Sequence, residues 1–294
     1  MPDPSLCLLT VHAHPDDEAS KGAATVAKYH DAGVRTVLVC CTGGEAGDIL
    51  NPAMDLPEVR ERLPEIRLEE LARSAEIIGY DELVMLGYRD SGMPDTPENE
   101  HPDCFARADL DEAVGRLVAV IRRGRPQVIV TYPDEQERYP HPDHLRVHDI
   151  SVPAFEAAGD PDRYPGAGEP WQPLKLYYSL WSHARIVALH EAFVREGLES
   201  PFDEKWLAAE SRDDRITTRI PIREHYDRRV QALLAHATQV DPNSPFWFGL
   251  PPEVASGTYP YDDYRLARSL AEAEPPEDDL FAGLRTPAYD PHGS

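Results

Sequence analysis

Short apolar runs alternate with amphipathic stretches along the first half of the chain. Apolar, partly β-branched runs predict buried strands at residues 6–11, 34–41, 82–86 and 127–132. Between them, residues with helical spacing predict helices at 19–32, 58–78, 109–123 and 143–158. This alternation of strand and helix is typical of an α/β fold, in which helices cover both faces of a mostly parallel sheet.

The second half of the chain is less regular. We expect a strand at 174–180, a helix at 182–196, an edge strand at 215–222 and a helix at 224–236. Residues 242–264 mix prolines with aromatic residues, which indicates an irregular packed cap. The predicted organisation is therefore a Rossmann-like core over 1–180, a C-terminal cap over 181–271 in the same domain, and a mostly flexible acidic tail over 272–294 that Leu280 and Phe281 could anchor.

Histidines and carboxylates gather on the turn after the first predicted strand. They are His12, His14, Asp16, Asp17 and Glu18. The carboxyl ends of parallel strands form the crevice in which α/β proteins bind ligands, and imidazole with carboxylate is a donor set for a divalent cation. Aspartate near a helix start is also favoured for structural reasons alone, so this cluster by itself fits a helix N-cap better than a metal site.

A second cluster follows the strand at 127–132 and precedes the next helix. It contains Tyr139, His141, Asp143 and His144. Long loops at 42–56, 87–108 and 133–142 follow the second, third and fourth strands, so all three should face the sheet edge that carries the first cluster. Two strand ends that each deliver histidine and aspartate to one edge indicate a shared metal site.

The pair of motifs A-H-P-D-D-E and H-P-D-H resembles the zinc-dependent N-deacetylases of the LmbE-like, or PIG-L, type. The resemblance implies a hydrolase of a linear amide bond that binds one Zn²⁺ per chain, with another divalent transition metal as the alternative. Position by position, it implies zinc ligands at His14, Asp17 and His144 and a general base at Asp16. It also implies that Tyr139 and His141 stabilise the oxyanion and that Asp143 orients His141.

The same resemblance implies substrate contacts at Lys21, Arg67 and Asp90, for which the alternative is a solvated surface charge. His12 fits a structural histidine near the sheet end better than a fourth ligand. One departure concerns the loop before Tyr139. Glu137 and Arg138 stand where the family usually has two glycines, which puts the substrate range in question more than the metal chemistry.

Residues 43–57, 169–178 and 236–243 are similar to the mycothiol S-conjugate amidases within this family. The implied reaction hydrolyses the amide between an S-conjugated N-acetylcysteine and glucosaminyl-inositol, a detoxification step. The alternatives are the deacetylase of mycothiol biosynthesis, a related amidase of secondary metabolism, and a non-catalytic sugar- or metal-binding module. A binding module needs ligands but no base, so Asp16 speaks against the last of these.

Composition and charge limit the kinds of molecule that the protein is expected to bind. The 294 residues carry 29 basic and 53 acidic side chains, a formal net charge of −24 that disfavours nucleic acids and anionic membranes. We see neither an apolar stretch of membrane-spanning length nor a secretory signal, so we expect a cytoplasmic protein with a small-molecule thiol conjugate as substrate and leave the oligomeric state open. Cys7, Cys40 and Cys41 fall in predicted buried strands, whereas Cys104 falls in a loop and its reactivity is open.

Overall fold

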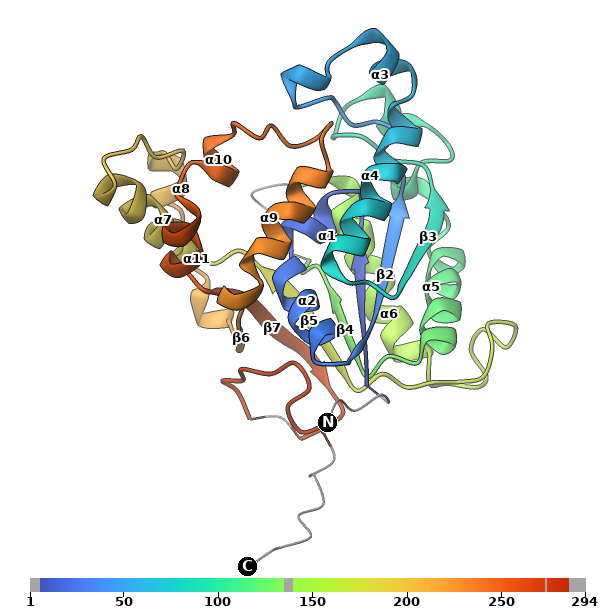
Figure 1. Ribbon diagram of the computed structural model, residues 1–294. Coiled ribbons are helices and arrows are strands. Elements are labelled where there is room, and N and C mark those ends of the chain that lie inside the picture. The colour runs from blue at the N-terminus through green and yellow to red at the C-terminus, as the bar shows by residue number, and fades with distance from the viewer. Residues whose placement is uncertain (1–5, 135–139, 273, 286–294) are drawn as a thin grey trace, which may run out of the picture.

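The computed structural model describes residues 6–134, 140–272 and 274–285. Its centre is a sheet with the strand order β3-β2-β1-β4-β5-β7-β6 (Figure 1). The strands are β1 (Cys7–His12), β2 (Arg35–Thr42), β3 (Glu82–Tyr88), β4 (Val128–Thr131), β5 (Lys175–Leu180), β6 (Thr218–Pro221) and β7 (Tyr261–Ser269). The first five strands pair in parallel, whereas β7 pairs antiparallel with both β5 and β6. The predicted α/β class with a mostly parallel sheet is confirmed.

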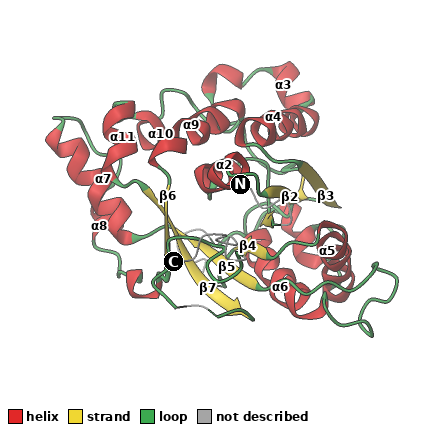
Figure 2. Cartoon of the chain, turned by 60° about the horizontal axis from the view of Figure 1, so that its bottom comes forward, coloured by secondary structure: helices red, strands yellow, loops and turns green. Residues whose placement is uncertain are grey.

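Helices cover both faces of this sheet (Figure 2). They are α1 (Asp17–Ser20), α2 (Ala23–Asp31), α3 (Pro57–Glu61), α4 (Leu63–Ile78), α5 (Leu110–Gly124), α6 (Pro142–Ala157), α7 (His183–Arg195), α8 (Glu204–Leu207), α9 (Tyr226–Ala235), α10 (Pro245–Phe248) and α11 (Pro252–Thr258). Short 3₁₀ turns lie at Pro52–Met54, Pro97–Glu100, Phe105–Arg107, Asp213–Arg215 and Arg223–His225. Among the described residues, no helix combines the length and the apolar character needed to cross a bilayer.

Alternate residues of β1 belong to two separate hydrophobic cores. Leu9 packs with residues of α5 and α6 on one face of the sheet, whereas Leu8 packs with residues of α2 and α9 on the other. This is the two-residue period of a strand that is buried on both sides. Because β1 is buried along its whole length, the chain first becomes accessible after the strand, at Asp16 in the turn into α1.

The predicted helix at 19–32 is two helices in the structure, separated at Gly22. Gly22 has a φ of 101°, and a Cβ atom there would lie 2.9 Å from the hydroxyl oxygen of Tyr264. The left-handed backbone and the close approach both favour glycine. The break leaves α1 as a single short turn, so the residues after β1 belong to a compact loop held by its neighbours rather than to a long helix.

The strand β7 was not predicted, since residues 242–264 were expected to form an irregular cap. This strand contains two polar residues, Asp262 and Asp263, at positions that are buried. Asp262 accepts hydrogen bonds from Thr25 (2.8 Å) and from Arg185 (2.9 Å), and Asp263 accepts one from the hydroxyl of Ser182 (2.6 Å). The apolar alternation that identifies a strand in a sequence is therefore missing here.

Residues 274–285, part of the expected tail, pack against the sheet and α2. Leu280 and Phe281 are fully buried. Glu277 pairs with the buried ammonium of Lys175 at 2.7 Å, and Asp279 accepts a hydrogen bond from the hydroxyl of Tyr29 at 2.9 Å. These contacts fix the segment to the edge of the sheet that lies opposite the turn after β1.

Candidate metal centre and active site

The turn after β1 brings His14, Asp16 and Asp17 to the carboxyl edge of the sheet, and the start of α6 brings His144 to the same place. His14, Asp17 and His144 are buried, and each offers one donor atom within 4.8 Å of the others. The Asp17 Oδ2 atom lies 3.5 Å from His14 Nδ1 and 3.3 Å from His144 Nε2. The two motifs that the sequence analysis paired therefore meet in space.

Two imidazoles and one carboxylate suit a zinc-like cation, and three protein ligands leave a coordination position open for substrate. Metal ligation requires neutral imidazole and ionised carboxylate. Burial lowers the pKa of His144 to about 4 and so keeps its ring neutral. Burial would raise the pKa of Asp17, but the charge of Lys21 and the hydrogen bonds from His14 and His144 lower it well below its usual value. These three residues could therefore hold a metal ion.

His14 also belongs to a second group of donors, together with Asp90, His141 and Asp143. Its Nε2 atom lies 3.1 Å from Asp143 Oδ2 and 3.6 Å from Asp90 Oδ1. Burial opposes a charge on His14, but hydrogen bonds to Asp143 and Asp17 raise its pKa well above the usual value, so a cation bound there would displace a proton from the ring. The His14 ring is thus fixed from two sides, which sets its orientation toward the shared site.

Asp143 is anchored by Ser91 as well as by His14. Its carboxylate accepts a hydrogen bond from the Ser91 backbone N–H at 2.9 Å and another from the Ser91 hydroxyl. The predicted contact of this carboxylate with His141 differs from what we find: His141 caps α6, and its Nδ1 atom accepts from the backbone N–H of Asp143 at 3.2 Å. A role for Asp143 in orienting His141 stays a prediction, and the structure adds Ser91 as its support.

Asp16 occupies a left-handed backbone position, with a φ of 110°. Such a conformation costs a residue with a side chain on the order of 1–3 kcal/mol and persists only where neighbours impose it. Here the Asp16 N–H donates to Glu18 Oε2 at 3.0 Å. Its side chain is 31% exposed. Burial of the rest raises the pKa of Asp16, and the adjacent charge of Arg67 limits that rise.

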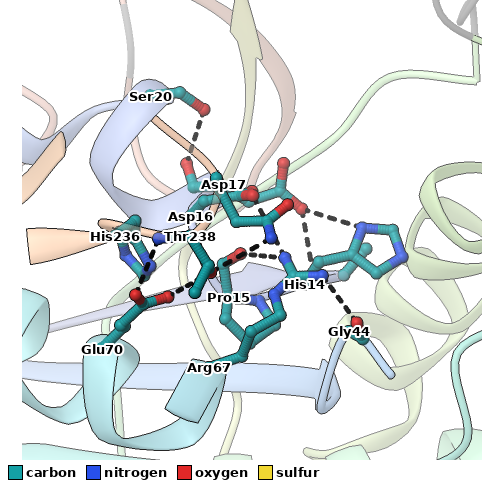
Figure 3. Close-up of polar contacts among 12 residues, drawn as sticks. His14, Pro15, Asp16, Asp17, Ser20, Gly44, Arg67, Glu70, His236 and Thr238 are labelled. Atoms are coloured by element: carbon teal, nitrogen blue, oxygen red, sulfur yellow. Dashed lines mark hydrogen bonds and ion pairs between the residues drawn. The ribbon is translucent and has the colours of Figure 1, made fainter. Parts of the chain in front are cut away.

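Arg67 reaches from α4 to the turn (Figure 3). Its guanidinium donates to the carbonyls of Gly44 and Pro15, both at 2.6 Å, and to Asp16 Oδ2 at 3.1 Å. A Cβ atom on Gly44 or Gly47 would lie within 2.4 Å of this guanidinium, so the glycines of the 43–47 loop make room for it. Arg67 was predicted to contact substrate, and that stays a prediction; the structure shows it buried and holding Asp16.

Lys21 and Asp90, the other predicted substrate contacts, also lie beside the shared site. The ammonium of Lys21 pairs with Asp17 Oδ1. Asp90 is buried, and its carboxylate accepts from the N–H groups of Gly92 (2.8 Å) and Ala46 (3.3 Å). Burial would raise the pKa of Asp90, but the hydrogen bond to His14 lowers it. Their substrate contacts stay predictions.

Tyr139 lies outside the described residues, as do Glu137 and Arg138. His12 lies apart from both donor groups and shares a 2.9 Å hydrogen bond with the hydroxyl of Tyr132, as expected of a structural histidine. Sequence reasoning missed His236, which contacts Glu18 at 2.6 Å across 218 residues of chain. The only feature of the sequence that pointed to His236 was its place in the motif at 236–243.

Comparison with known proteins agrees with this geometry. The profile of the PIG-L family, described as GlcNAc-PI de-N-acetylase, matches residues 9–155. The chain is 46% identical to a mycothiol S-conjugate amidase of Streptomyces coelicolor, over 95% of this chain and 98% of the relative. It is 40% identical to a 1D-myo-inositol 2-acetamido-2-deoxy-alpha-D-glucopyranoside deacetylase of Geodermatophilus obscurus, over 96% and 99%.

A solved structure shares the fold. The N,N'-diacetylchitobiose deacetylase of Pyrococcus horikoshii superposes with a TM-score of 0.60 at 16% identity, over 88% of this chain and 83% of that one. At this identity the likeness concerns the fold alone, and the chemistry has to be argued from the site.

Proposed function

The chain belongs to the PIG-L family, whose hydrolases act on amide bonds, and we propose that it hydrolyses the amide of mycothiol S-conjugates. The products would be a mercapturate, which is an S-conjugated N-acetylcysteine, and glucosaminyl-inositol. One observation carries the proposal: the donor atoms of His14, Asp17 and His144 converge beside Asp16, in a chain so similar to a mycothiol S-conjugate amidase over almost its whole length.

Zn²⁺ is the metal we propose, one ion held by His14, Asp17 and His144. A zinc ion in this place would polarise the amide carbonyl and lower the pKa of a water molecule. The donor set supports zinc because it combines neutral imidazole with carboxylate, whereas magnesium and calcium favour oxygen ligands alone.

Asp16 serves as the general base in this proposal. It would accept the proton of the attacking water and pass it to the leaving amine of the glucosamine. Arg67 holds Asp16 Oδ2 and thereby orients the carboxylate. The raised pKa of Asp16, caused by burial, makes this carboxylate a stronger base than an exposed one.

His141 and Tyr139 would donate hydrogen bonds to the developing oxyanion, a contact that stabilises the transition state more than the ground state. The His141 ring lies 4.4 Å from the His14 ring, measured between centroids, so it borders the proposed metal site. Lys21, Arg67 and Asp90 remain our candidates for substrate contact, with Asp90 gripping the sugar.

A deacetylase acting on N-acetylglucosaminyl-inositol is the second candidate, supported by the 40% identity to the Geodermatophilus enzyme. The same residues would perform that reaction, because only the acyl group differs. A related amidase of secondary metabolism would also use them. The acyl group that the protein accepts therefore distinguishes these functions.

The test is a parallel assay of both substrates with the zinc-loaded protein. The bimane conjugate of mycothiol and N-acetylglucosaminyl-inositol are compared by kcat/KM, with Asp16→Asn as the inactive variant. Asp103→Asn, which removes an exposed carboxylate elsewhere, is the matched control. A higher kcat/KM for the conjugate supports the amidase. A higher value for the acetylated sugar supports the deacetylase, and turnover of neither substrate refutes both.

A further inference from the structure

A pocket is lined by residues of α7, α9, α10 and α11. These helices lie together on one side of the molecule (Figures 1 and 2). The pocket holds about 620 Å³ of space, part of it open to solvent. The rings of Trp181 and Phe246 stack at 5.7 Å, and Trp247 meets Phe246 edge to face at 4.7 Å. Walls of this kind favour a flat, apolar guest.

Arg229 gives this aromatic pocket a positive charge without a matching carboxylate. Its guanidinium lies 5.9 Å from the ring centres of both Trp181 and Trp247, and its buried Nε has no hydrogen-bond partner among the described residues. Arg185 lines the same pocket but is paired with Asp262 at 2.9 Å. Burial, and then the charge of Arg185, lower the pKa of Arg229.

A buried charge is stable only when it is paired or otherwise compensated. The surface of this protein is strongly acidic, with a formal net charge of −24, yet no carboxylate of the described chain pairs with Arg229. Trp181 and Trp247 compensate part of the charge through cation–π contact. An acidic group of a ligand would supply the missing partner.

The pocket lies near the proposed metal site. A smaller cavity shares Trp181 and Arg185 with it and extends to Ser20 and Lys21. Lys21 pairs in turn with the candidate ligand Asp17. Trp181 and Arg185 therefore lie between the aromatic walls and the Lys21 side of the proposed metal site.

The order of the strands places the pocket relative to the proposed substrate contacts. His14 follows β1 and His144 begins the helix after β4, in the middle of the sheet edge. Asp90, the proposed sugar contact, follows β3 on one side, and Trp181 follows β5 on the other. An amide held at the centre with its sugar toward Asp90 would thus direct its acyl side toward the pocket.

We propose that this pocket receives the S-linked group of the conjugate and that Arg229 makes it select an aromatic ring carrying an acid. The inference rests on the proposed amidase function, since only an S-conjugate has such a group on the acyl side. The variable part of the substrate is then recognised by α7, α9, α10 and α11, away from the residues that perform the chemistry.

The experiment compares three mycothiol conjugates: S-(4-carboxybenzyl), S-benzyl and S-methyl. For each variant, kcat/KM of the acid conjugate is divided by that of the S-methyl conjugate. Arg229→Met should lower this ratio about 10- to 100-fold, the range expected for a lost charge-assisted hydrogen bond. Arg229→Lys should restore part of it. Ala255→Phe, which fills the pocket and keeps the charge, should lower the ratios of both aryl conjugates.

Arg195→Gln is the matched control, because Arg195 is exposed at the end of α7 and does not line the pocket. A readout that needs no turnover is the quenching of tryptophan fluorescence by S-(4-carboxybenzyl)-N-acetylcysteine in protein treated with chelator. Circular dichroism checks that every variant is folded.

Saturable quenching that Arg229→Met weakens, together with the expected fall in the ratio, supports the proposal. Equal ratios in wild type and Arg229→Met, with no saturable quenching, overturn it. If the kcat/KM ratio of the S-benzyl conjugate is as high as that of the acid conjugate, the proposed selection for an acid is wrong. Arg229-dependent quenching without hydrolysis of any conjugate supports the site for an aromatic acid and refutes the amidase.

Discussion

Glu18 and His236 form a fully buried ion pair beneath the turn that carries Asp16. Glu18 Oε1 lies 2.6 Å from His236 Nε2 and accepts from the Ser74 hydroxyl at 2.5 Å, while Oε2 accepts from the Asp16 N–H at 3.0 Å. Burial opposes both charges, yet their mutual attraction lowers the pKa of Glu18 and raises that of His236. The pair is therefore ionised and fixes the strained backbone of Asp16.

Two substitutions separate the charge from the hydrogen bonds. His236→Leu leaves a buried carboxylate without its cation, which should cost about 3–5 kcal/mol of a total stability of roughly 5–15 kcal/mol. In Glu18→Gln, the amide NH₂ can donate to both Ser74 and a neutral His236, and its oxygen still accepts from Asp16. That variant should lose only on the order of 1 kcal/mol.

The double variant Glu18→Gln/His236→Leu should be more stable than His236→Leu alone, since it no longer buries an unpaired charge. The assay is urea unfolding of metal-free protein, which removes stabilisation by bound ions. Two results would refute the reasoning: a loss in Glu18→Gln as large as in His236→Leu, or additive losses in the double variant.

The stability of this pair should also depend on pH in a defined direction. The folded-state pKa of His236 is raised above its ordinary value of 6.5. Its contribution is therefore complete below pH 6.5 and is lost as the pH rises through the raised pKa. The gap in stability between wild type and His236→Leu should narrow on the alkaline side.

Four further predictions follow from the site and the core. Chelation should abolish activity and a divalent ion restore it, whereas His144→Ala should lose the metal itself, as measured by elemental analysis. Asp16→Asn should retain the metal but lower kcat about 10²–10⁴-fold, as expected for a lost general base; loss of the metal instead would make Asp16 a ligand. Gly44→Ala should lower the midpoint of thermal unfolding, because its Cβ atom would meet the Arg67 guanidinium at 2.4 Å. All four thiols are buried, Cys104 included, so a thiol reagent at about pH 8 should label none of them until the protein unfolds.

The sequence was informative about the fold where local patterns decide the structure. The strands from β1 to β5 are apolar runs of ordinary length, and Pro64 lies in the first turn of α4, where a proline is tolerated. Gly22 could not be identified as a helix break, because the reason is its contact with Tyr264, more than 200 residues away. The strand β7 was not predicted for a related reason, because the hydrogen-bond partners of Asp262 and Asp263 are brought to them only by folding.

The same contrast holds for the site. His14, Asp16 and Asp17 stand on one turn, so their spacing reveals them, and H-P-D-H does the same for His144. The supports of that turn come from elsewhere: Ser74 from α4 and His236 from just after α9. A lone serine or histidine on an amphipathic helix carries no signal of such a role, because only long-range packing gives it a partner.

The residues proposed for the reaction and those proposed for substrate specificity lie in different parts of the chain. The family profile covers residues 9–155, which contain the proposed ligands, the base and Asp90. Trp181, Arg229 and Trp247 all lie beyond it, on the elements that follow β5. Since the ligands sit on turns fixed by the central sheet, α7, α9, α10 and α11 can differ among relatives without moving the metal site. An amidase and a deacetylase can therefore share one reaction centre, and the pocket at the end of β5 is where their preference for the acyl group should be decided.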